Sequence, residues 1–192
     1  DRGLTFSKAH ARKGIEFFEE ILHLNGGEFE GLPFRLLAWQ SFIVGSIFGW
    51  LRADGSRRFR VAYVETGKGS GKSPLAAGIG LKGLAADGEA RAEVYAAATK
   101  RDQAMILFRD ATAMYSQSPE LLRRLNPSGV AEKTWNLSYQ ATGSFFRPIA
   151  ADQGQSGPRP HFALVDEFHE HPTNHVLEML RAGFKSRRQP LL

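Results

Sequence analysis

A short glycine-rich segment holds the residues whose types and spacing most clearly predict chemistry. Residues 67–73 read Gly-Lys-Gly-Ser-Gly-Lys-Ser. Glycines let a chain turn tightly enough to point several backbone N–H groups at one anion, as a bound triphosphate requires. In such a loop the ammonium group of Lys72 would contact the β- and γ-phosphates, and the hydroxyl of Ser73 would bind Mg²⁺. The segment therefore predicts a site for a nucleoside triphosphate and Mg²⁺.

The segment departs from the phosphate-binding pattern G-x-x-x-x-G-K-[ST] at its first position. Thr66 stands where that pattern has glycine, and Gly67 follows one place later. Pro74 also removes one backbone N–H, although proline is tolerated in the first turn of a helix. The alternative is a glycine- and serine-rich turn that binds no ligand. The residues predicted to surround the nucleotide are Thr66, Gly67, Lys68, Gly69, Ser70, Gly71, Lys72 and Ser73.

Two carboxylates form the second chemical landmark of the sequence. Asp166 and Glu167 follow the four apolar residues Phe162–Val165, a pattern typical of a buried strand. In open α/β sheets ligands bind at the carboxyl ends of strands, so both side chains would reach the nucleotide. Asp166 would hold the Mg²⁺ shell, mostly through water. Glu167 would polarise the attacking water as a general base.

A cluster of histidines offers a competing interpretation. His161, His169, His171 and His175 lie close together, and His171 and His175 could share one helix face as zinc ligands. The metalloprotease pattern H-E-x-x-H is not met, because Thr173 occupies the position of its second histidine. We expect these histidines to border the nucleotide site instead.

The elements around the glycine-rich segment are those that a phosphate-binding loop requires. Phe59–Val64 is rich in β-branched and aromatic residues, which predicts a buried strand. Leu75–Leu84 is rich in alanine and leucine, which predicts a helix whose positive end faces the loop. The order strand, loop, helix favours a P-loop over a turn without a ligand.

The rest of the chain alternates between apolar patterns of helical and of strand period. Ala92–Ala98 fits a core strand, and Thr99 can cap the helix that follows it. Residues 150–160 show no periodicity and are a candidate mobile loop. The pattern predicts an α/β fold, a P-loop NTPase with a central, mostly parallel sheet flanked by helices. Further helices are predicted at 15–24, 36–51, 100–115, 120–125 and 172–183, a β-hairpin at 134–138 and 144–148, and the start of a strand at 189–192.

Composition sets limits on the class of protein. The chain has 192 residues, of which 42% are hydrophobic, enough for one domain with a sizeable core. No apolar run approaches the roughly 18 residues of a membrane span, so no membrane partner is expected. Cysteine is absent, which excludes disulfides and thiolate metal sites. The net charge of +5 permits a polyanionic partner without identifying one.

Gln40 lies within the apolar helical stretch 36–51 and allows two interpretations. One is a surface glutamine on a packed helix. Alternatively its amide, with adjacent donor and acceptor groups, would recognise the matching groups of adenine.

The order of these segments resembles the large terminase subunit of tailed bacteriophages. The resemblance begins near residue 31, and its most specific parts are Trp39-Gln40 and the segment 98–104. The segments that carry it are Pro33–Leu36, Trp39-Gln40, Phe48–Trp50, Gly71–Ser73, Ala96–Ala104, Asp166-Glu167 and Arg188–Leu191.

This resemblance implies a P-loop ATPase with Glu167 as the catalytic glutamate and Gln40 as the adenine-sensing residue. Residues 31–192 would be the motor domain, preceded by a helical extension at residues 1–30. Lys68 falls where many terminases carry an arginine, so the charge persists with another donor geometry. The nuclease domain and the coupling motif of the family would lie beyond Leu192, so no DNA cleavage is expected.

The resemblance also implies a function, partners and a location. The domain would hydrolyse ATP with Mg²⁺ to pump double-stranded DNA into a procapsid. Its partners would be DNA, the portal of the procapsid and the small terminase subunit. Copies would form a ring during packaging and could be monomers in isolation. The place of action would be the host bacterial cytoplasm, with transient attachment at the portal vertex.

A second cation is expected to complete the site from a neighbouring copy. Arg159 is the best candidate, because Pro158 and Pro160 would stiffen its loop and present the side chain outward. Arg147 is an alternative, and an ordinary exposed arginine is the simpler interpretation of Arg159.

Three other functions fit parts of the sequence. A helicase-like ATPase that remodels nucleic acid would share the fold. A kinase or switch protein would use the same loop but not the glutamate of an Asp-Glu pair. A scaffold could retain the P-loop only as structure.

Overall fold

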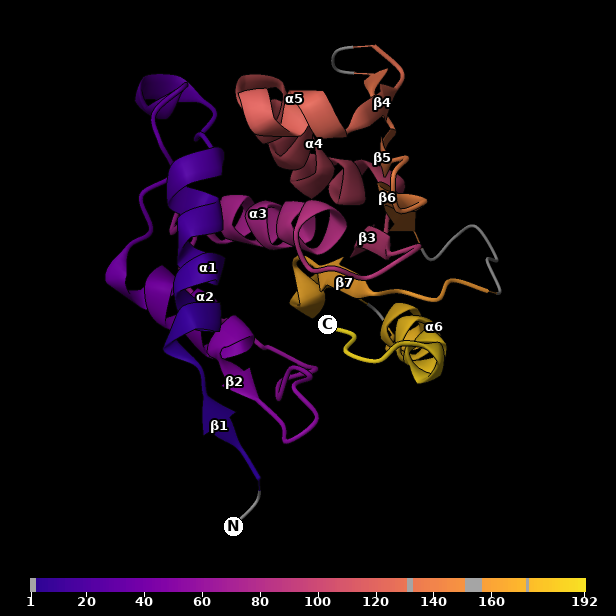
Figure 1. Ribbon diagram of the computed structural model, residues 1–192. Helices are drawn as coiled ribbons and strands as arrows, with labels where there is room; N and C mark the ends of the chain where they lie inside the picture. Colours follow the sequence, from indigo (N-terminus) through magenta and orange to yellow (C-terminus); the bar gives the residue numbers. More distant parts are fainter. Residues whose placement is uncertain (1–2, 131–132, 151–156, 172) are drawn as a thin grey trace.

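The computed structural model describes residues 3–130, 133–150, 157–171 and 173–192. Its centre is a five-stranded sheet in the order β4-β5-β6-β3-β7 (Figure 1). The strands are β3 (Glu93–Ala98), β4 (Asn126–Ser128), β5 (Asn136–Tyr139), β6 (Ser144–Ala150) and β7 (Phe162–Val165). β3 pairs in parallel with β6 and β7, whereas β4, β5 and β6 pair antiparallel. The predicted α/β fold is confirmed, with the predicted hairpin forming the antiparallel part of the sheet.

Helices cover both faces of the sheet. On one face lie α3 (Lys72–Ala85) and α4 (Arg101–Gln117), with α5 (Pro119–Arg124) beside α4. The other face carries α6 (His175–Gly183), as Figure 1 shows. Side chains of β3 alternate between the two sides, since successive residues of a strand point to opposite faces. Val94 and Ala96 join the larger core, and Tyr95 and Ala97 join the core under α6.

α3 lies unusually close to the sheet because glycines replace side chains where it crosses the strands. A β-carbon added at Gly80 would stand 2.7 Å from the ring of Phe146. One added at Gly83 would stand 2.5 Å from the ring of Phe162. Both distances are too short for a real contact, so these positions require glycine while α3 keeps its place.

The amino-terminal part packs two helices side by side. α1 (Lys8–Glu16) begins with Ser7 as its cap and continues into a π-helical turn at Phe17–Ile21, and it packs against α2 (Ala38–Gly49) (Figure 1). The helix predicted at 15–24 therefore starts earlier and ends earlier. Its first half was not predicted because Ala11 and Gly14, rather than large apolar residues, form its buried face. Short strands β1 (Thr5–Phe6) and β2 (Trp50–Leu51) pair antiparallel, and a 3₁₀ turn occupies Gly27–Phe29.

The predicted buried strand at 59–64 is wrong. Its only backbone bonds to a sheet neighbour, among the described residues, join Leu192 N to Arg60 O at 3.0 Å and Ala62 N to Leu192 O at 2.8 Å. Val61 and Tyr63 are 48% and 74% exposed. The segment is thus extended rather than a buried strand. The strand predicted at 189–192 reduces to a parallel bridge between Leu191 and Phe162.

The predicted helix cap at Thr99 and the predicted mobile loop have different outcomes. Thr99 does not cap α4: the cap residue is Lys100, without a side-chain bond, and the Thr99 hydroxyl is buried with no partner among the described residues. Residues 151–156 of the candidate mobile loop lie outside the described residues. In the described part of the chain no helix is long and apolar enough to cross a membrane. The remaining turns are 3₁₀ helices at Phe168–Glu170 and Phe184–Ser186.

Candidate nucleotide-binding and catalytic site

The glycine-rich loop ends at the first turn of α3. Gly71 caps that helix in the left-handed conformation, with φ of 84°, and Gly69 has φ of 78°. No side chain caps the helix, so its first N–H groups are available to an anion. The hydroxyls of Thr66 and Ser70 lie 2.6 Å apart across the loop. Threonine at the position of the usual glycine therefore contributes a bond that closes the loop.

Both predicted carboxylates contact the P-loop. Ser73 Oγ donates a hydrogen bond of 2.9 Å to Asp166 Oδ2, and Lys72 Nζ lies 3.0 Å from Glu167 Oε1. The hydrogen bond to Glu167 raises the pKa of Lys72 above its usual range. The start of α3 and the end of β7 thus bring the four residues together, although they are far apart in the sequence.

Glu167 is held in an unusual backbone conformation. Its φ of 47° is left-handed, which is uncommon for a residue other than glycine. The N–H of Glu167 donates to Asp166 Oδ1 at 2.9 Å, and His169 Nδ1 lies 3.4 Å from Glu167 Oε2. Such outliers cluster at functional sites, where surrounding contacts impose them. The sequence placed His169 near the site but did not predict this conformation.

Gln40 lies beside the loop. Its side chain is buried at 3% exposure, so the interpretation as a surface glutamine is wrong. Gln40 Oε1 accepts a bond of 2.9 Å from Leu37 N, and its Nε2 lies 3.3 Å from the position that a β-carbon on Gly71 would take. The amide is therefore fixed in place next to the P-loop.

The oxygen atoms of Ser73 and Asp166 suit Mg²⁺. They are a hydroxyl and a carboxylate, the hard ligands that this ion prefers, and they already lie within 2.9 Å of each other. For zinc, the described residues contain no group of three or more histidine, cysteine, aspartate or glutamate side chains that could hold a metal ion, so the zinc interpretation gains no support. His161 lies buried 2.7 Å from Asp87, which follows the end of α3 far from the P-loop, so the expectation that it borders the nucleotide site is wrong.

Arg159 lies at the amino-terminal end of the parallel strands, opposite the end that carries Asp166. Its backbone N–H donates to Glu93 Oε2 at 2.8 Å, and Glu93 begins β3. Because β3 and β7 are parallel, the end of the sheet where Arg159 lies is one strand length from the end that carries Asp166. The six residues of β3 span about 20 Å. The structure therefore does not bring Arg159 to the P-loop of its own chain.

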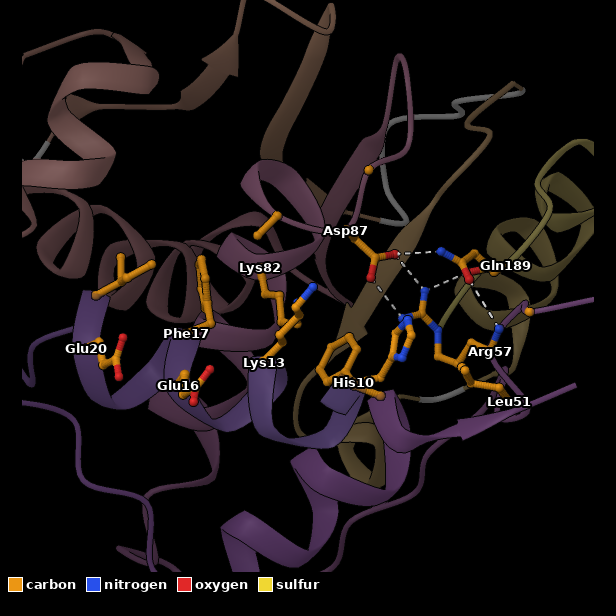
Figure 2. Close-up of a pocket in the computed structure, with 15 residues that line it drawn as sticks. His10, Lys13, Glu16, Phe17, Glu20, Leu51, Arg57, Lys82, Asp87 and Gln189 are labelled. Atoms are coloured by element: carbon orange, nitrogen blue, oxygen red, sulfur yellow. Dashed lines mark hydrogen bonds and ion pairs between the residues drawn. The ribbon is translucent and has the colours of Figure 1, made fainter. Parts of the chain in front are cut away.

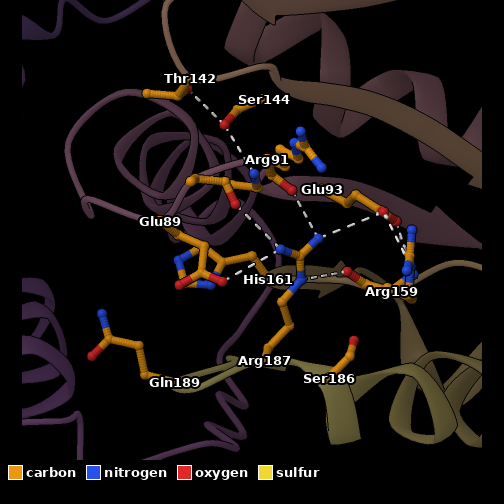
Figure 3. A network of polar contacts seen from close by, with 12 residues as sticks. Glu89, Arg91, Glu93, Thr142, Ser144, Arg159, His161, Ser186, Arg187 and Gln189 are labelled. Carbon is orange, nitrogen blue, oxygen red and sulfur yellow. Dashed lines mark hydrogen bonds and ion pairs between the residues drawn. The ribbon is translucent and has the colours of Figure 1, made fainter.

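A polar network fixes the backbone around Arg159 (Figure 3). The buried guanidinium of Arg187 donates to the carbonyl oxygens of Arg159 and Arg91 at 2.9 and 2.8 Å. The side chain of Arg159 itself is 69% exposed and 3.9 Å from Glu93. Of the other two predicted cations, Arg147 stacks 4.6 Å from the ring centre of Phe145, and Lys68 is exposed at the loop turn.

Comparison with known proteins identifies the family. Residues 38–192 match the family described as terminase large subunit, ATPase domain. This chain belongs to that family. The match covers the loop, both carboxylates and Gln40, and it confirms the resemblance drawn from the sequence.

Solved terminase structures share the fold. The HK97 bacteriophage large terminase superposes with a TM-score of 0.77 at 21% identity, over 95% of this chain and 36% of that chain. The large terminase ATPase domain of Thermus phage P74-26, in an unmutated and a mutant form, gives 0.52 at 21% identity over 69% of this chain and 56% of that one. The chain therefore spans about a third of the length of the HK97 protein. A comparison with curated proteins found no match.

Proposed function

We propose that this chain hydrolyses ATP and serves as the motor domain of a phage DNA-packaging terminase. One observation carries the proposal: both P-loop side chains, Lys72 and Ser73, contact the carboxylates that end β7. Membership of the terminase ATPase family supports the same chemistry.

Each of the four residues has a distinct role in the proposed reaction. Lys72 exchanges its carboxylate partner for the β- and γ-phosphates, and Ser73 and Asp166 hold Mg²⁺. Mg²⁺, when bound, neutralises charge that develops on the phosphate oxygens. Glu167, once released from Lys72, accepts a proton from the attacking water.

The remaining loop residues bind and select the nucleotide. Backbone N–H groups of residues 67–73 surround the phosphates, and Thr66 keeps the loop closed through Ser70. Lys68 supplies a further charge at the exposed turn. The fixed amide of Gln40 recognises adenine, which favours ATP over GTP.

In our proposal the free energy of ATP hydrolysis drives DNA translocation. In our proposal the partners are double-stranded DNA, the portal of the procapsid, the small terminase subunit and further copies of this chain in a ring. The reaction takes place in the host bacterial cytoplasm and at the portal vertex. A helicase-like ATPase has the same site chemistry, but the family match favours the terminase.

ATP turnover with Mg²⁺ tests the chemistry. Lys72→Ala should abolish turnover, because no other side chain places a fixed charge at the β- and γ-phosphates. Lys185→Ala, which removes an exposed lysine elsewhere, should leave turnover unchanged. Near-normal turnover in Lys72→Ala would refute the P-loop assignment.

A further inference from the structure

A cavity of about 550 Å³ lies at the far end of α3 from the P-loop (Figure 2). Its walls come from α1, the π-helical turn, the end of α2 and the last turn of α3. The volume is within the range of small-molecule sites in proteins, about 300–1,000 Å³. Neither the P-loop nor the carboxylates of β7 contribute to it.

Lys82 is the unusual residue of this cavity. It lines the cavity at only 6% exposure, with its ammonium 4.7 Å from the ring centre of Phe48 and 5.7 Å from that of Phe17. No carboxylate lies within ion-pair distance of it in the part of the chain that the structure describes. Burial lowers the pKa of Lys82 below its usual range. The ammonium is thus held by aromatic faces and by the charge of Asp87 at longer range, without a direct ion pair among the described residues.

The carboxylate of Asp87 acts on Lys82 through its charge, which opposes the effect of burial on the pKa of Lys82, but among the described residues its hydrogen bonds and ion pairs go to other side chains. Asp87 accepts two bonds from Arg57, at 3.1 and 2.8 Å. His161 Nε2 lies 2.7 Å from Asp87 Oδ2, and Gln189 donates to the same oxygen at 3.3 Å. Figure 2 shows these contacts on the side of the cavity away from Glu16 and Glu20.

A second lysine stands next to the first. Lys13 also lines the cavity, beside Lys82 in Figure 2, and its positive charge contributes to the lowered pKa of Lys82. The carboxylates of Glu16, the last residue of α1, and of Glu20 in the π-helical turn also line the cavity, and Glu16 lies 3.8 Å from Arg12. The two lysines therefore form a cationic patch in the middle of the cavity, between Glu16 and Glu20 on one side and Asp87 on the other (Figure 2).

We propose that this cavity binds an oxyanion, a carboxylate or a phosphate group, with Lys82 as its buried counter-charge and Lys13 at the mouth. The rings of Phe17 and Phe48 would cover an apolar part of the same ligand. Ligand binding here would occur on the helix that carries Lys72, at its opposite end.

Lysine side-chain NMR during anion titration tests the proposal. The probes are inorganic phosphate, acetate and succinate, with sodium chloride at equal ionic strength as the control. The titration uses a Lys72→Ala background, so that phosphate in the P-loop does not contribute and a failed nucleotide site would not affect the result. We expect a saturable shift of the Lys82 signal and a rise of its pKa on binding, since the anion supplies a direct ion-pair partner.

Substitutions then distinguish specific anion binding at Lys82 from adventitious binding of anions to the surface. Lys82→Met should weaken binding by about 10-fold or more, whereas Lys8→Met, an exposed lysine on the same helix as Lys13, should not. Lys82→Met should also raise the melting temperature of the ligand-free protein, because it removes a buried ammonium while keeping the side-chain volume. A response to phosphate alone would identify a phosphate-bearing ligand, and a response to the two carboxylates alone a carboxylate. An unmoved Lys82 signal, or equal binding in Lys82→Met, would overturn the proposal.

Discussion

Glu167 is the residue whose geometry says most about the chemistry. In the free protein its carboxylate contacts Lys72 at 3.0 Å and His169 at 3.4 Å, and its backbone is left-handed. The proposed general base is therefore paired with the residue that we expect to bind phosphate. In this proposal nucleotide binding breaks the pair, so the apparent affinity for ATP includes the cost of releasing Lys72.

Glu167→Gln separates binding from hydrolysis. The amide keeps the shape but cannot accept the proton, so turnover should fall by about 10²-fold or more. ATP should bind at least as well, because the neutral amide holds Lys72 less strongly. Turnover assays and nucleotide titration measure the two effects, and Glu178→Gln on the exposed face of α6 is the control. Loss of binding together with turnover would make Glu167 structural.

Gln40→Leu tests the selection of adenine. The substitution keeps the volume and removes both polar atoms that we assign to adenine. The KM for ATP should rise by about 10-fold, the equivalent of one or two hydrogen bonds, while the KM for GTP should change little. A thermal unfolding curve checks that the lost bond to Leu37 N has not destabilised α2. An equal change for both nucleotides would argue against a role in selection.

Residue types and spacing predicted the chemical groups of the site but not their backbone conformation or burial. Lys72, Ser73, Asp166 and Glu167 were placed together because glycine spacing and strand ends are local signals. The left-handed φ of Glu167 depends on contacts with residues from other segments, and no local pattern encodes it. The burial of Gln40 likewise follows from how α2 packs.

At the scale of elements, the buried group around Asp87 joins segments that are distant in the sequence. Arg57 follows β2, Asp87 follows α3, His161 precedes β7, and Gln189 lies near the end of the chain. The guanidinium of Arg57 also stacks 4.7 Å from the ring centre of Phe162. This group fixes the end of α3 to the sheet.

Asp87→Asn should destabilise the fold by about 3–5 kcal/mol, since it leaves the buried Arg57 without its counter-charge. Urea unfolding at neutral pH measures the change. Asp54→Asn, on an exposed turn, is the matched control and should have a much smaller effect. A change below about 1 kcal/mol would mean that the group contributes no more than a surface ion pair.

Acid sensitivity provides a second measurement on the same residue. Burial opposes ionisation of Asp87, but its bonds to His161 and Arg57 outweigh burial and lower its pKa to about 2. The resulting stabilisation is present above about pH 4, the unfolded pKa of aspartate, and is lost as the pH falls toward 2. Asp87→Asn should therefore lose less free energy of unfolding between pH 4 and 2 than the unsubstituted protein.

The elements were predicted well where the apolar pattern was strong and poorly where packing decides. α2, α3, α4 and β3 follow from their composition. Most of α1 was not predicted, because small residues form its contact face. A strand was wrongly predicted at 59–64, because its β-branched residues favour a strand but too few backbone hydrogen bonds form there. The prediction that Thr99 caps α4 was wrong, because its hydroxyl is buried without a hydrogen-bond partner among the described residues.

At the scale of the whole molecule, Arg159 lies too far from its own P-loop to serve it. Its backbone is fixed by Glu93 and Arg187, while its side chain is exposed. This combination suits a residue that acts on a neighbouring copy. We therefore keep Arg159 as the proposed trans-acting cation, with Arg147 as the alternative.

Mixing two inactive variants tests this arrangement. Arg159→Ala lacks the proposed cation and Glu167→Gln lacks the base, so mixed interfaces should regain part of the activity. Specific activity of the unsubstituted protein should rise with concentration, and Arg159→Ala should remove that rise without weakening ATP binding. Arg181→Ala, which removes an exposed arginine of α6, is the control. No recovery under conditions where unsubstituted copies assemble would exclude Arg159.

The glycine contacts of α3 have a mechanical consequence. At Gly80 and Gly83 the helix backbone touches the rings of Phe146 and Phe162 directly, with no layer of flexible side chains between helix and sheet. The contact between α3 and the sheet is therefore stiff at these positions, because no side chain there can change rotamer to let the helix move relative to the strands. In the proposed ATP cycle, a small shift of Lys72 would reach Lys82 and Asp87 nearly undiminished. Gly80→Ala and Gly83→Ala would therefore alter the stiffness of the contact between α3 and the sheet as well as the stability of the fold.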